Sequence, residues 1–360
     1  YNVGQYYAFY IYNGFNNLFV FVLGVQTVIG KDYYKDHFEN CICTDYEVEC
    51  HYEKKLSGDI TKLLHYIKDD VTSITITDSN LQKLPANTFG SCRHDMSLEL
   101  LSLKTVDLSN NNISTIHRKT FHCFPNLETL ILKNNNWKIS NMPFDTNYFA
   151  SLPSLKYLDL TNTFYGDWDD DLQVVPLARI FGDSDYISLE TLELSNNKQL
   201  LFTDSFLSTN VLCHMPALKA LNLDNNDLHY ALLPMETGCL DSLEMIDYSY
   251  NQIQALSVEF MNKLEQLQNL RFVKLDHNPF VCDCRLITTY KWLNETTVPV
   301  NKSELNCTAD EIIPRIYYKP IIDLSMSDLV CLDSELNSAL SAEYNIAFLI
   351  LFAVCSVLFK

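Results

Sequence analysis

Basic residues are scarce in this 360-residue chain, which has 26 lysines and arginines against 45 aspartates and glutamates and a formal net charge of −19. Nucleic-acid binding needs a basic face that neutralises phosphates, so this composition argues against that class of partner. Catalytic signatures are missing too, because there is no G-x-S-x-G or H-E-x-x-H motif and the nine glycines form no phosphate-binding loop. We therefore expect a binding protein, not an enzyme, with no cofactor.

The 12 cysteines lack the spacing of a zinc site. Cys282-x-Cys284, followed by Cys307 and Cys331, has neither the two-residue gap nor the histidines of a zinc finger. Many cysteines without a metal pattern are typical of proteins that fold in an oxidising compartment. We expect disulfides and no metal.

One short stretch, residues 103–113 (LKTVDLSNNNI), sets a spacing that recurs along the chain. Its first, fourth, sixth and eleventh places are apolar and its ninth is Asn111, which is the pattern of a leucine-rich repeat. Asparagine fills the ninth place in six copies, and Ser79 and Thr163 fill it in the others. The eight copies begin at Val71, Leu103, Leu127, Leu155, Leu189, Leu218, Leu243 and Leu270.

A single copy cannot bury its own apolar face, so the copies must stack into a solenoid. Eightfold recurrence at spacings of roughly 24 to 34 residues also excludes an isolated amphipathic helix. The expected fold is an α/β solenoid, a leucine-rich repeat horseshoe with cysteine-rich caps. Its predicted parts are an N-terminal cap (31–70), eight repeats (71–281) with an insertion near 163–186, and a C-terminal cap (282–332).

The fifth place of each repeat lies between two core positions and should face outward on the concave side. Four of these places are acidic, namely Asp107, Asp159, Glu193 and Asp247, and Tyr157 lies beside them. An exposed acidic column with an aromatic neighbour suits a basic protein partner. A charged face that only keeps the protein soluble explains the same residues.

The insertion near 163–186 is a second candidate contact region. It contains the acidic, aromatic run from Tyr165 to Asp171 with Trp168 at its centre, and it lacks the ligand spacing of a calcium loop. Loops on a rigid scaffold often carry recognition. A solvated insertion without a binding role has the same composition.

Four cysteines lie in the segments between repeats. Cys92 and Cys123 belong to the first two repeats, and Cys213 and Cys239 to neighbouring later ones. Each couple could therefore come within disulfide reach across adjacent turns, giving Cys92–Cys123 and Cys213–Cys239. The alternative is four buried free thiols.

Both ends of the chain carry apolar runs. The first 30 residues have no charge, and 17–30 has the length of a signal-peptide core, although a buried strand is the alternative. After a polar linker (333–345), residues 346–359 are apolar, and at 1.5 Å per residue they reach about 21 Å of the ~30 Å needed to span a bilayer. Either this run is part of a transmembrane helix, or it is a glycolipid-anchor signal with residues 337–339 as the attachment site.

Cys41-x-Cys43-x6-Cys50 resembles the N-terminal cap of extracellular leucine-rich repeat proteins, with His37 where a further cysteine is usual. The resemblance implies a Cys41–Cys50 bridge and leaves Cys43 free or paired elsewhere. Residues 278–284 (NPFVCDC) resemble the start of the C-terminal cap of the same proteins. There the resemblance implies Cys282–Cys307 and Cys284–Cys331, with Trp292 and Leu293 over the open end of the core.

Four N-glycosylation sequons support exposure outside the cell, and three of them lie in the C-terminal cap. They are Asn112, Asn294, Asn301 and Asn306.

The chain resembles the trophoblast glycoprotein (Wnt-activated inhibitory factor) family, and the likeness is closest around the C-terminal cap, with NPFVCDC (278–284) and WLNET (292–296). The resemblance implies a single-pass protein of the plasma membrane that faces outward and inhibits Wnt/β-catenin signalling. It implies an extracellular protein ligand or a Wnt co-receptor of the low-density-lipoprotein-receptor-related type as the partner. An adhesion or innate-immune type ectodomain without Wnt activity is the alternative.

The chain departs from that family at two positions tied to Wnt inhibition. Glu49 stands where the family has a lysine, and Ala309 stands where it has an aromatic residue. The resemblance therefore carries over the fold more fully than the activity.

Overall fold

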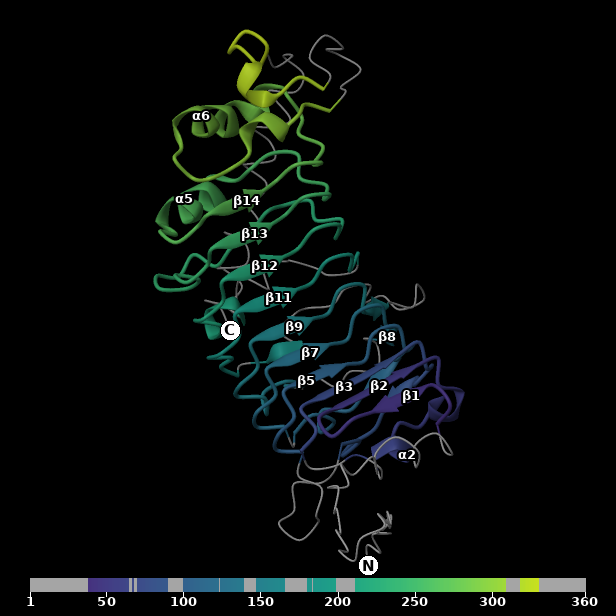
Figure 1. The fold of residues 1–360 in the computed structure, drawn as a ribbon. Coiled ribbons are helices and arrows are strands. Elements are labelled where there is room, and N and C mark those ends of the chain that lie inside the picture. The colour runs from purple at the N-terminus through teal and green to yellow at the C-terminus, as the bar shows by residue number, and fades with distance from the viewer. Residues whose placement is uncertain are drawn as a thin grey trace, which may run out of the picture.

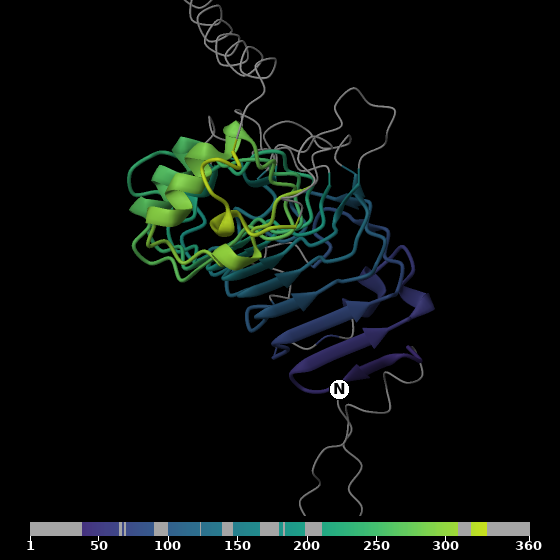
Figure 2. The same cartoon turned by 90° about the horizontal axis from the view of Figure 1, so that it is seen from above.

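The structure is a computed structural model in which the chain winds into a solenoid, with the strands stacked along one side of the coil (Figure 1). Seen from above, the strands form one continuous layer and the return segments run behind it (Figure 2). The structure describes residues 38–64, 67, 70–89, 100–122, 124–138, 147–165, 180–182, 184–198, 211–308 and 318–329.

A ten-stranded sheet forms the concave side, in the order β1-β2-β3-β5-β7-β9-β11-β12-β13-β14. β1 pairs with β2 in the antiparallel sense, and every later pair is parallel. The strand bounds are β1 Cys41–Cys43, β2 Glu47–His51, β3 Ser73–Thr77, β5 Thr105–Asp107, β7 Thr129–Ile131, β9 Tyr157–Asp159, β11 Thr191–Glu193, β12 Ala220–Asn222, β13 Met245–Asp247 and β14 Phe272–Lys274.

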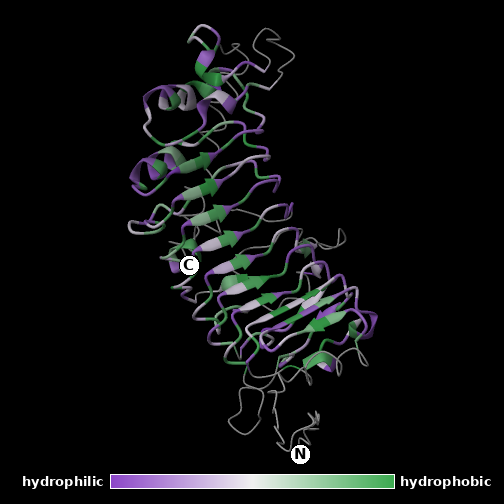
Figure 3. Cartoon of the chain, in the orientation of Figure 1, coloured by the Kyte–Doolittle hydropathy of each residue, from purple (hydrophilic) through white to green (hydrophobic). Residues whose placement is uncertain are grey.

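Each of the eight predicted repeats contributes one strand of this sheet, from β3 to β14, so the predicted leucine-rich repeat solenoid is confirmed. The fourth and sixth places point into the core, as Val106 and Leu108 illustrate with no exposed surface. Hydrophobic colour accordingly recurs from strand to strand, while α5 and many loops are hydrophilic (Figure 3). Burial of these alternate positions is what fixes the register of the strands.

The ninth-place asparagines form a buried ladder where each turn leaves the sheet. The Asn251 side chain accepts hydrogen bonds from the backbone N–H groups of Asn226 and Leu228, both at 3.0 Å, and donates to the carbonyl of Leu223 at 2.9 Å. Its neighbour Asn278 repeats the pattern one turn later, accepting from the N–H of Ile253. An amide suits this place because it supplies a donor and an acceptor to backbone groups that water cannot reach.

Thr163 replaces asparagine in the centre of this ladder. Its hydroxyl donates to the carbonyl of Leu132 at 2.9 Å and so replaces the hydrogen bond that an asparagine amide would donate to a backbone carbonyl. Its N–H group donates to the side chain of Asn197, so the next rung still joins the ladder. The missing asparagine therefore interrupts the amide pattern without breaking the stack.

Short elements and apolar rings fill the space behind the sheet. A line of buried phenylalanines joins successive repeats, with ring centroids of Phe121 and Phe149 6.1 Å apart and those of Phe149 and Phe181 6.0 Å apart. These rings link neighbouring turns through apolar contact. The remaining elements are η1 Lys54–Leu56, α2 Thr61–Leu64, β4 Lys83–Leu84, β6 Thr115–Ile116, β8 Trp137–Lys138, β10 Phe164–Tyr165, η2 Val211–His214, α5 Val258–Gln266, η3 Cys284–Leu286, α6 Ile287–Glu295, η4 Lys302–Glu304 and η6 Ile321–Asp323.

The C-terminal end of the core is closed by α6 and the segment after it (Figure 1). Leu293 is fully buried, as expected for a residue that covers the open end. Trp292 is only half-buried, and its indole N–H donates to Glu265 of the helix α5 at 2.8 Å. Trp292 thus joins the C-terminal cap to α5, while Leu293 covers the open end of the core.

Three disulfides lie in the described part of the chain. Cys41–Cys50 ties the antiparallel pair β1 and β2 at a Cα–Cα distance of 4.1 Å. Cys213–Cys239 joins adjacent turns at 4.7 Å, and Cys282–Cys307 lies in the C-terminal cap at 5.5 Å. Cys284 is also disulfide-bonded. The predicted partner of Cys284, Cys331, and the predicted couple Cys92 and Cys123 lie outside the described residues.

Cys43 is the free cysteine of the described residues, and it is buried on β1. Burial raises the pKa of its thiol to about 11. The predicted leader (1–30) and anchor segment (346–359) lie outside the described residues. Among the residues that are described, no helix is long and apolar enough to cross a membrane.

Candidate partner-binding face

The concave face is organised in rows, because parallel strands in register place equal positions of successive repeats side by side. The fifth-place row follows directly from the strand pairing, and it begins in the N-terminal cap. Its members are Glu49, Thr75, Asp107, Ile131, Asp159, Glu193, Asn222, Asp247 and Lys274. All four acidic residues predicted as contacts belong to this row.

Two of these acidic residues are less exposed than a solvent-facing column requires. Asp159 and Asp247 are 7% and 4% exposed, which corrects the expectation that all four carboxylates lie open on the surface. Each of the two accepts a hydrogen bond from a backbone N–H two residues later, that of Thr161 at 2.8 Å and that of Ser249 at 2.9 Å. Such aspartates cap the end of a strand, a role that competes with contact to a partner.

Asp107 is half-buried and makes the same contact, accepting from the N–H of Ser109 at 2.9 Å. Glu193 is also half-buried, but its longer side chain accepts a hydrogen bond from Asn222. Glu193 and Asp107 are therefore the members of the predicted acidic set that keep exposed surface.

Negative charge accumulates around Glu193. Burial raises the pKa of its carboxyl, the hydrogen bond from Asn222 opposes that rise, and Asp159, Asp224 and Asp247 raise the pKa further. Lys274 compensates one end of the row, since its ammonium lies 2.8 Å from Asp247. That hydrogen bond raises the pKa of Lys274 in turn.

The third-place row runs parallel to the fifth, two residues earlier on each strand. The predicted contact Tyr157 lies on it, half-buried, and burial together with Asp159 and Glu193 raises the pKa of its phenol to about 12. Phe272 ends the row on β14 with 61% of its surface exposed. The row consists of Ser73, Thr105, Thr129, Tyr157, Thr191, Ala220, Met245 and Phe272.

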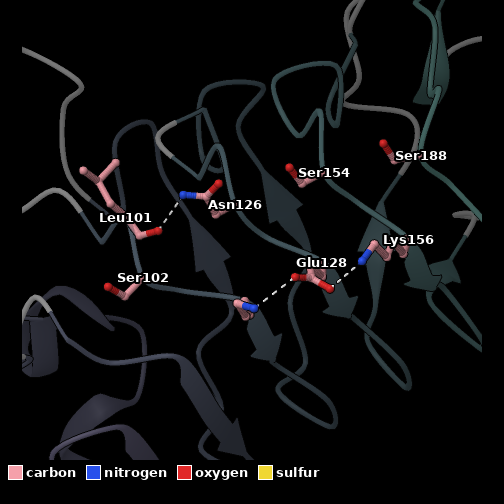
Figure 4. Close-up of a pocket in the computed structure, with 8 residues that line it drawn as sticks. Leu101, Ser102, Asn126, Glu128, Ser154, Lys156 and Ser188 are labelled. Carbon is pink, nitrogen blue, oxygen red and sulfur yellow. Dashed lines mark hydrogen bonds and ion pairs between the residues drawn. The ribbon is translucent and has the colours of Figure 1, made fainter.

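A second-place row on the flank of the sheet alternates in charge, which sequence reasoning missed because it considered only the fifth places and the aromatic residues near them. Glu128 bridges Lys104 at 3.3 Å and Lys156 at 2.8 Å (Figure 4). Hydrogen bonds from Lys156 and Lys104 lower the pKa of Glu128. After Thr72 in the first repeat, the row reads Lys104, Glu128, Lys156, Glu190, Lys219, Glu244 and Arg271.

Ion pairs continue along this flank between Lys219 and Glu190 at 2.7 Å and between Arg271 and Glu244 at 3.3 Å. The side chains are partly exposed, so each pair contributes about 0–1 kcal/mol to stability. A hollow of about 320 Å³ lies beside the ion pairs of Glu128, and it is lined by polar residues such as Ser154 (Figure 4). Because its charges neutralise one another, this flank presents little net charge to a partner.

The sequons fall outside the strands of the concave sheet. Asn112, Asn294 and Asn301 are exposed, while Asn306 is half-buried and its amide donates to the carbonyl of Glu304 at 3.1 Å. None of the four falls on a strand of the concave sheet. Trp168, the remaining predicted contact, lies outside the described residues.

One group in the described part of the chain has metal-ligand spacing, namely Cys213, Glu236 and Cys239. Its two sulfurs form the disulfide between adjacent turns, so they cannot act as thiolate ligands. The group is therefore a structural bridge with a carboxylate beside it.

Comparison with known proteins agrees with this architecture. A leucine rich repeat family profile matches residues 69–137. Trophoblast glycoprotein of Macaca fascicularis is 29% identical over 282 residues, covering 76% of this chain and 63% of that protein. The Mus musculus protein is 32% identical over 158 residues, covering 43% of this chain and 34% of that protein.

This chain has the leucine-rich repeat fold and is similar to trophoblast glycoprotein. The crystal structure of human 5T4 (Wnt-activated inhibitory factor 1, trophoblast glycoprotein) superposes with a TM-score of 0.55 at 22% identity, covering 81% of this chain and 97% of that one, and it supports the same fold. Oligodendrocyte-myelin glycoprotein of Homo sapiens is 27% identical over 264 residues, covering 72% of this chain and 50% of that protein. The chain spans less than two thirds of the length of these curated relatives.

Proposed function

We propose that this chain is a cell-surface glycoprotein that binds an extracellular protein partner on its concave face and inhibits Wnt/β-catenin signalling. The observation that carries the proposal is the concave face itself. Eight successive parallel strands present their third and fifth places in register, and no sequon falls on them. A rigid sheet of this kind holds contact residues in fixed positions, which lowers the entropic cost of binding.

Placement at the cell surface, facing outward, is supported by disulfides and by sequons with exposed side chains. Cys213–Cys239 and Cys282–Cys307 need an oxidising compartment, and Asn112 and Asn294 are open to glycosylation. The apolar run at 346–359 would supply the anchor, either as part of a transmembrane helix or as a glycolipid signal. A leader at 1–30 would direct the chain into the secretory pathway.

Wnt inhibition is inferred from the relatives, one of which bears the name Wnt-activated inhibitory factor 1. The partner would then be a Wnt co-receptor. An adhesion or innate-immune type ectodomain is the second candidate, and Glu49 favours it. This residue is exposed on β2, within the fifth-place row, where the resemblance expects a lysine, so the charge there is reversed.

A Wnt-stimulated transcriptional reporter in cells that express the full-length chain tests the proposal. We expect wild type to lower the signal and Glu49→Lys to lower it further. Glu259→Lys is the matched control, because Glu259 is an exposed glutamate on α5, outside the concave sheet, and should leave inhibition at the wild-type level. If neither wild type nor Glu49→Lys lowers the signal, Wnt inhibition is wrong, and a cell-aggregation assay tests the adhesion alternative.

A further inference from the structure

The third-place row changes character along the solenoid. On β3, β5 and β7 it consists of Ser73, Thr105 and Thr129, which are small and polar. On β12, β13 and β14 it consists of Ala220, Met245 and Phe272, which are apolar and lie side by side. The exposed, apolar end of the row therefore lies in the C-terminal half of the concave face.

Phe272 is the most conspicuous member of this apolar end, because 61% of its surface meets solvent although the strand beneath it is ordered and paired. A bridge between Val273 and Val300 continues the sheet beyond β14 and brings Pro299 beside Phe272. Exposed aromatic side chains on a rigid scaffold are the residue type that most often anchors protein interfaces.

The acidic groups of the same strands lie on the other side of the face. Residues along a strand rise about 3.3 Å each, so the fifth place lies about 6.6 Å and the seventh place about 13 Å from the apolar row, both within reach of one partner segment. Glu193 and Asp224 are half-buried and form no ion pair within the described part of the chain. The neighbouring carboxylates of Asp159 and Asp247 add to the negative potential there.

This arrangement contrasts with the second-place flank, where glutamates alternate with lysines and are paired. Lys274 is engaged by Asp247 and marks the C-terminal limit of the unpaired acidic stretch. In the register that the parallel Val273–Val300 bridge sets, Asn301 lies opposite Lys274. A glycan on that sequon would therefore mark the C-terminal edge of the concave face.

We propose that β11 to β14, with the residues that follow each strand, form a docking surface in which an apolar third-place row lies beside fifth-place and seventh-place acids. Its occupant is a basic segment of the protein partner that carries an apolar side chain. Cationic side chains of the segment pair with Glu193 and Asp224, and its apolar side chain packs on Met245 and Phe272. This inference rests on the proposed function and names the chemistry of the partner. A second copy of the chain fits poorly, because each copy carries a formal charge of −19 and would meet its own acidic row.

Short synthetic peptides provide the probe. One alternates arginine with leucine, a second has serine in place of leucine, and a third has glutamate in place of arginine. Binding of each to the immobilised, purified full chain is measured at low and at physiological salt. We expect the arginine–leucine peptide to bind about tenfold more tightly than either of the others, and we expect its affinity to fall as the salt concentration rises.

Variants assign the binding to the apolar row and to the acidic residues beside it. Phe272→Ser should weaken binding of the arginine–leucine peptide about tenfold. The double variant Glu193→Gln, Asp224→Asn should weaken binding of the same peptide by a similar factor and make its affinity less dependent on salt. The matched controls are Tyr318→Ser and Glu259→Gln, which remove an exposed aromatic and an exposed acid outside the concave sheet and should bind as wild type does.

Circular dichroism and thermal unfolding establish that each variant is folded, and Met245→Ser replaces Phe272→Ser if the latter is not. Equal binding by wild type and the row variants overturns the proposal, as does equal binding of the arginine–serine peptide. Self-association of the chain that Phe272→Ser abolishes would also overturn it, by making a second copy the occupant.

The reporter assay separates this inference from the proposed function. If the chain inhibits the reporter but Phe272→Ser inhibits equally and the peptide does not bind, the docking surface is wrong and the function stands. If the peptide binds as described but the chain never inhibits the reporter, the docking surface stands and Wnt inhibition is wrong.

Discussion

Replacing Asn251 with alanine should destabilise the solenoid more than any comparable change on its surface. Asn251 is 2% exposed, and its amide serves backbone groups of two adjacent repeats. Alanine removes the acceptor for the N–H groups of Asn226 and Leu228 and the donor to the carbonyl of Leu223. Two further carbonyls that Asn251 contacts keep other donors, so three buried backbone groups lose their partner.

Each unsatisfied buried group costs about 1–3 kcal/mol. Water can enter part of the space that the amide leaves, so the lower half of the summed range applies, and we expect a loss of about 3–6 kcal/mol. At about 2.1 cal/mol/K of unfolding entropy per residue, 1 kcal/mol corresponds to about 1.3 °C for a chain of this size, so the midpoint of thermal unfolding should fall by about 4–8 °C.

Asn225→Gly is the matched control. Asn225 is the neighbouring exposed asparagine, its φ is 55°, and glycine accepts that left-handed conformation. Its amide contacts only the side chain of Asn196, at 2.9 Å, in solvent. The control should therefore unfold close to wild type, and an Asn251→Ala midpoint equal to that of the control would refute the role assigned to the buried ladder.

Three further outcomes are expected. Cys284→Ser should lower the stability of the C-terminal cap by about 2–5 kcal/mol, and a thermal midpoint equal to wild type would contradict its place in a bridge. Cys43, buried with its pKa raised to about 11, should resist iodoacetamide at pH 8 until urea unfolds the chain, as mass spectrometry would detect. Glu193→Gln should stabilise the chain at pH 7, because the raised pKa of Glu193 disfavours its charged form in the folded state, and this gain should vanish as pH falls below about 4.3. A gain in urea midpoint that is equal at pH 7 and pH 3.5 would rule out that electrostatic origin.

The fold could be predicted from the sequence because its signal is repeated. The spacing that begins at Leu103 recurs in seven other places, and each copy forms a strand in the expected register. The concave rows also follow from spacing, since strand pairing joins Asp107, Ile131 and Asp159 as counted. Long-range geometry in a solenoid reduces to contacts between neighbours, and therefore local patterns suffice.

Exposure within those rows could not be predicted in the same way. The spacing places Asp247 and Glu193 alike, yet the short aspartate folds back onto the N–H and hydroxyl of Ser249 and is buried, whereas the longer glutamate keeps exposed surface. A serine two residues after each of Asp107 and Asp247 is the signal that could have indicated this capping role. The charge alternation of the second-place row was equally readable and would have identified the neutral flank.

The two charged rows of the concave side differ in a way that folding alone does not require. On the flank, each glutamate from Glu128 to Glu244 has a cationic neighbour one strand away, so charge is neutralised within the chain. The same solution is available on the fifth-place row, as Lys274 beside Asp247 demonstrates. For Glu193, burial raises the pKa of the carboxyl first and the neighbouring carboxylates raise it further, an arrangement that lowers stability at neutral pH. Cations supplied by a partner would offset this cost, which agrees with the docking surface proposed on β11 to β14.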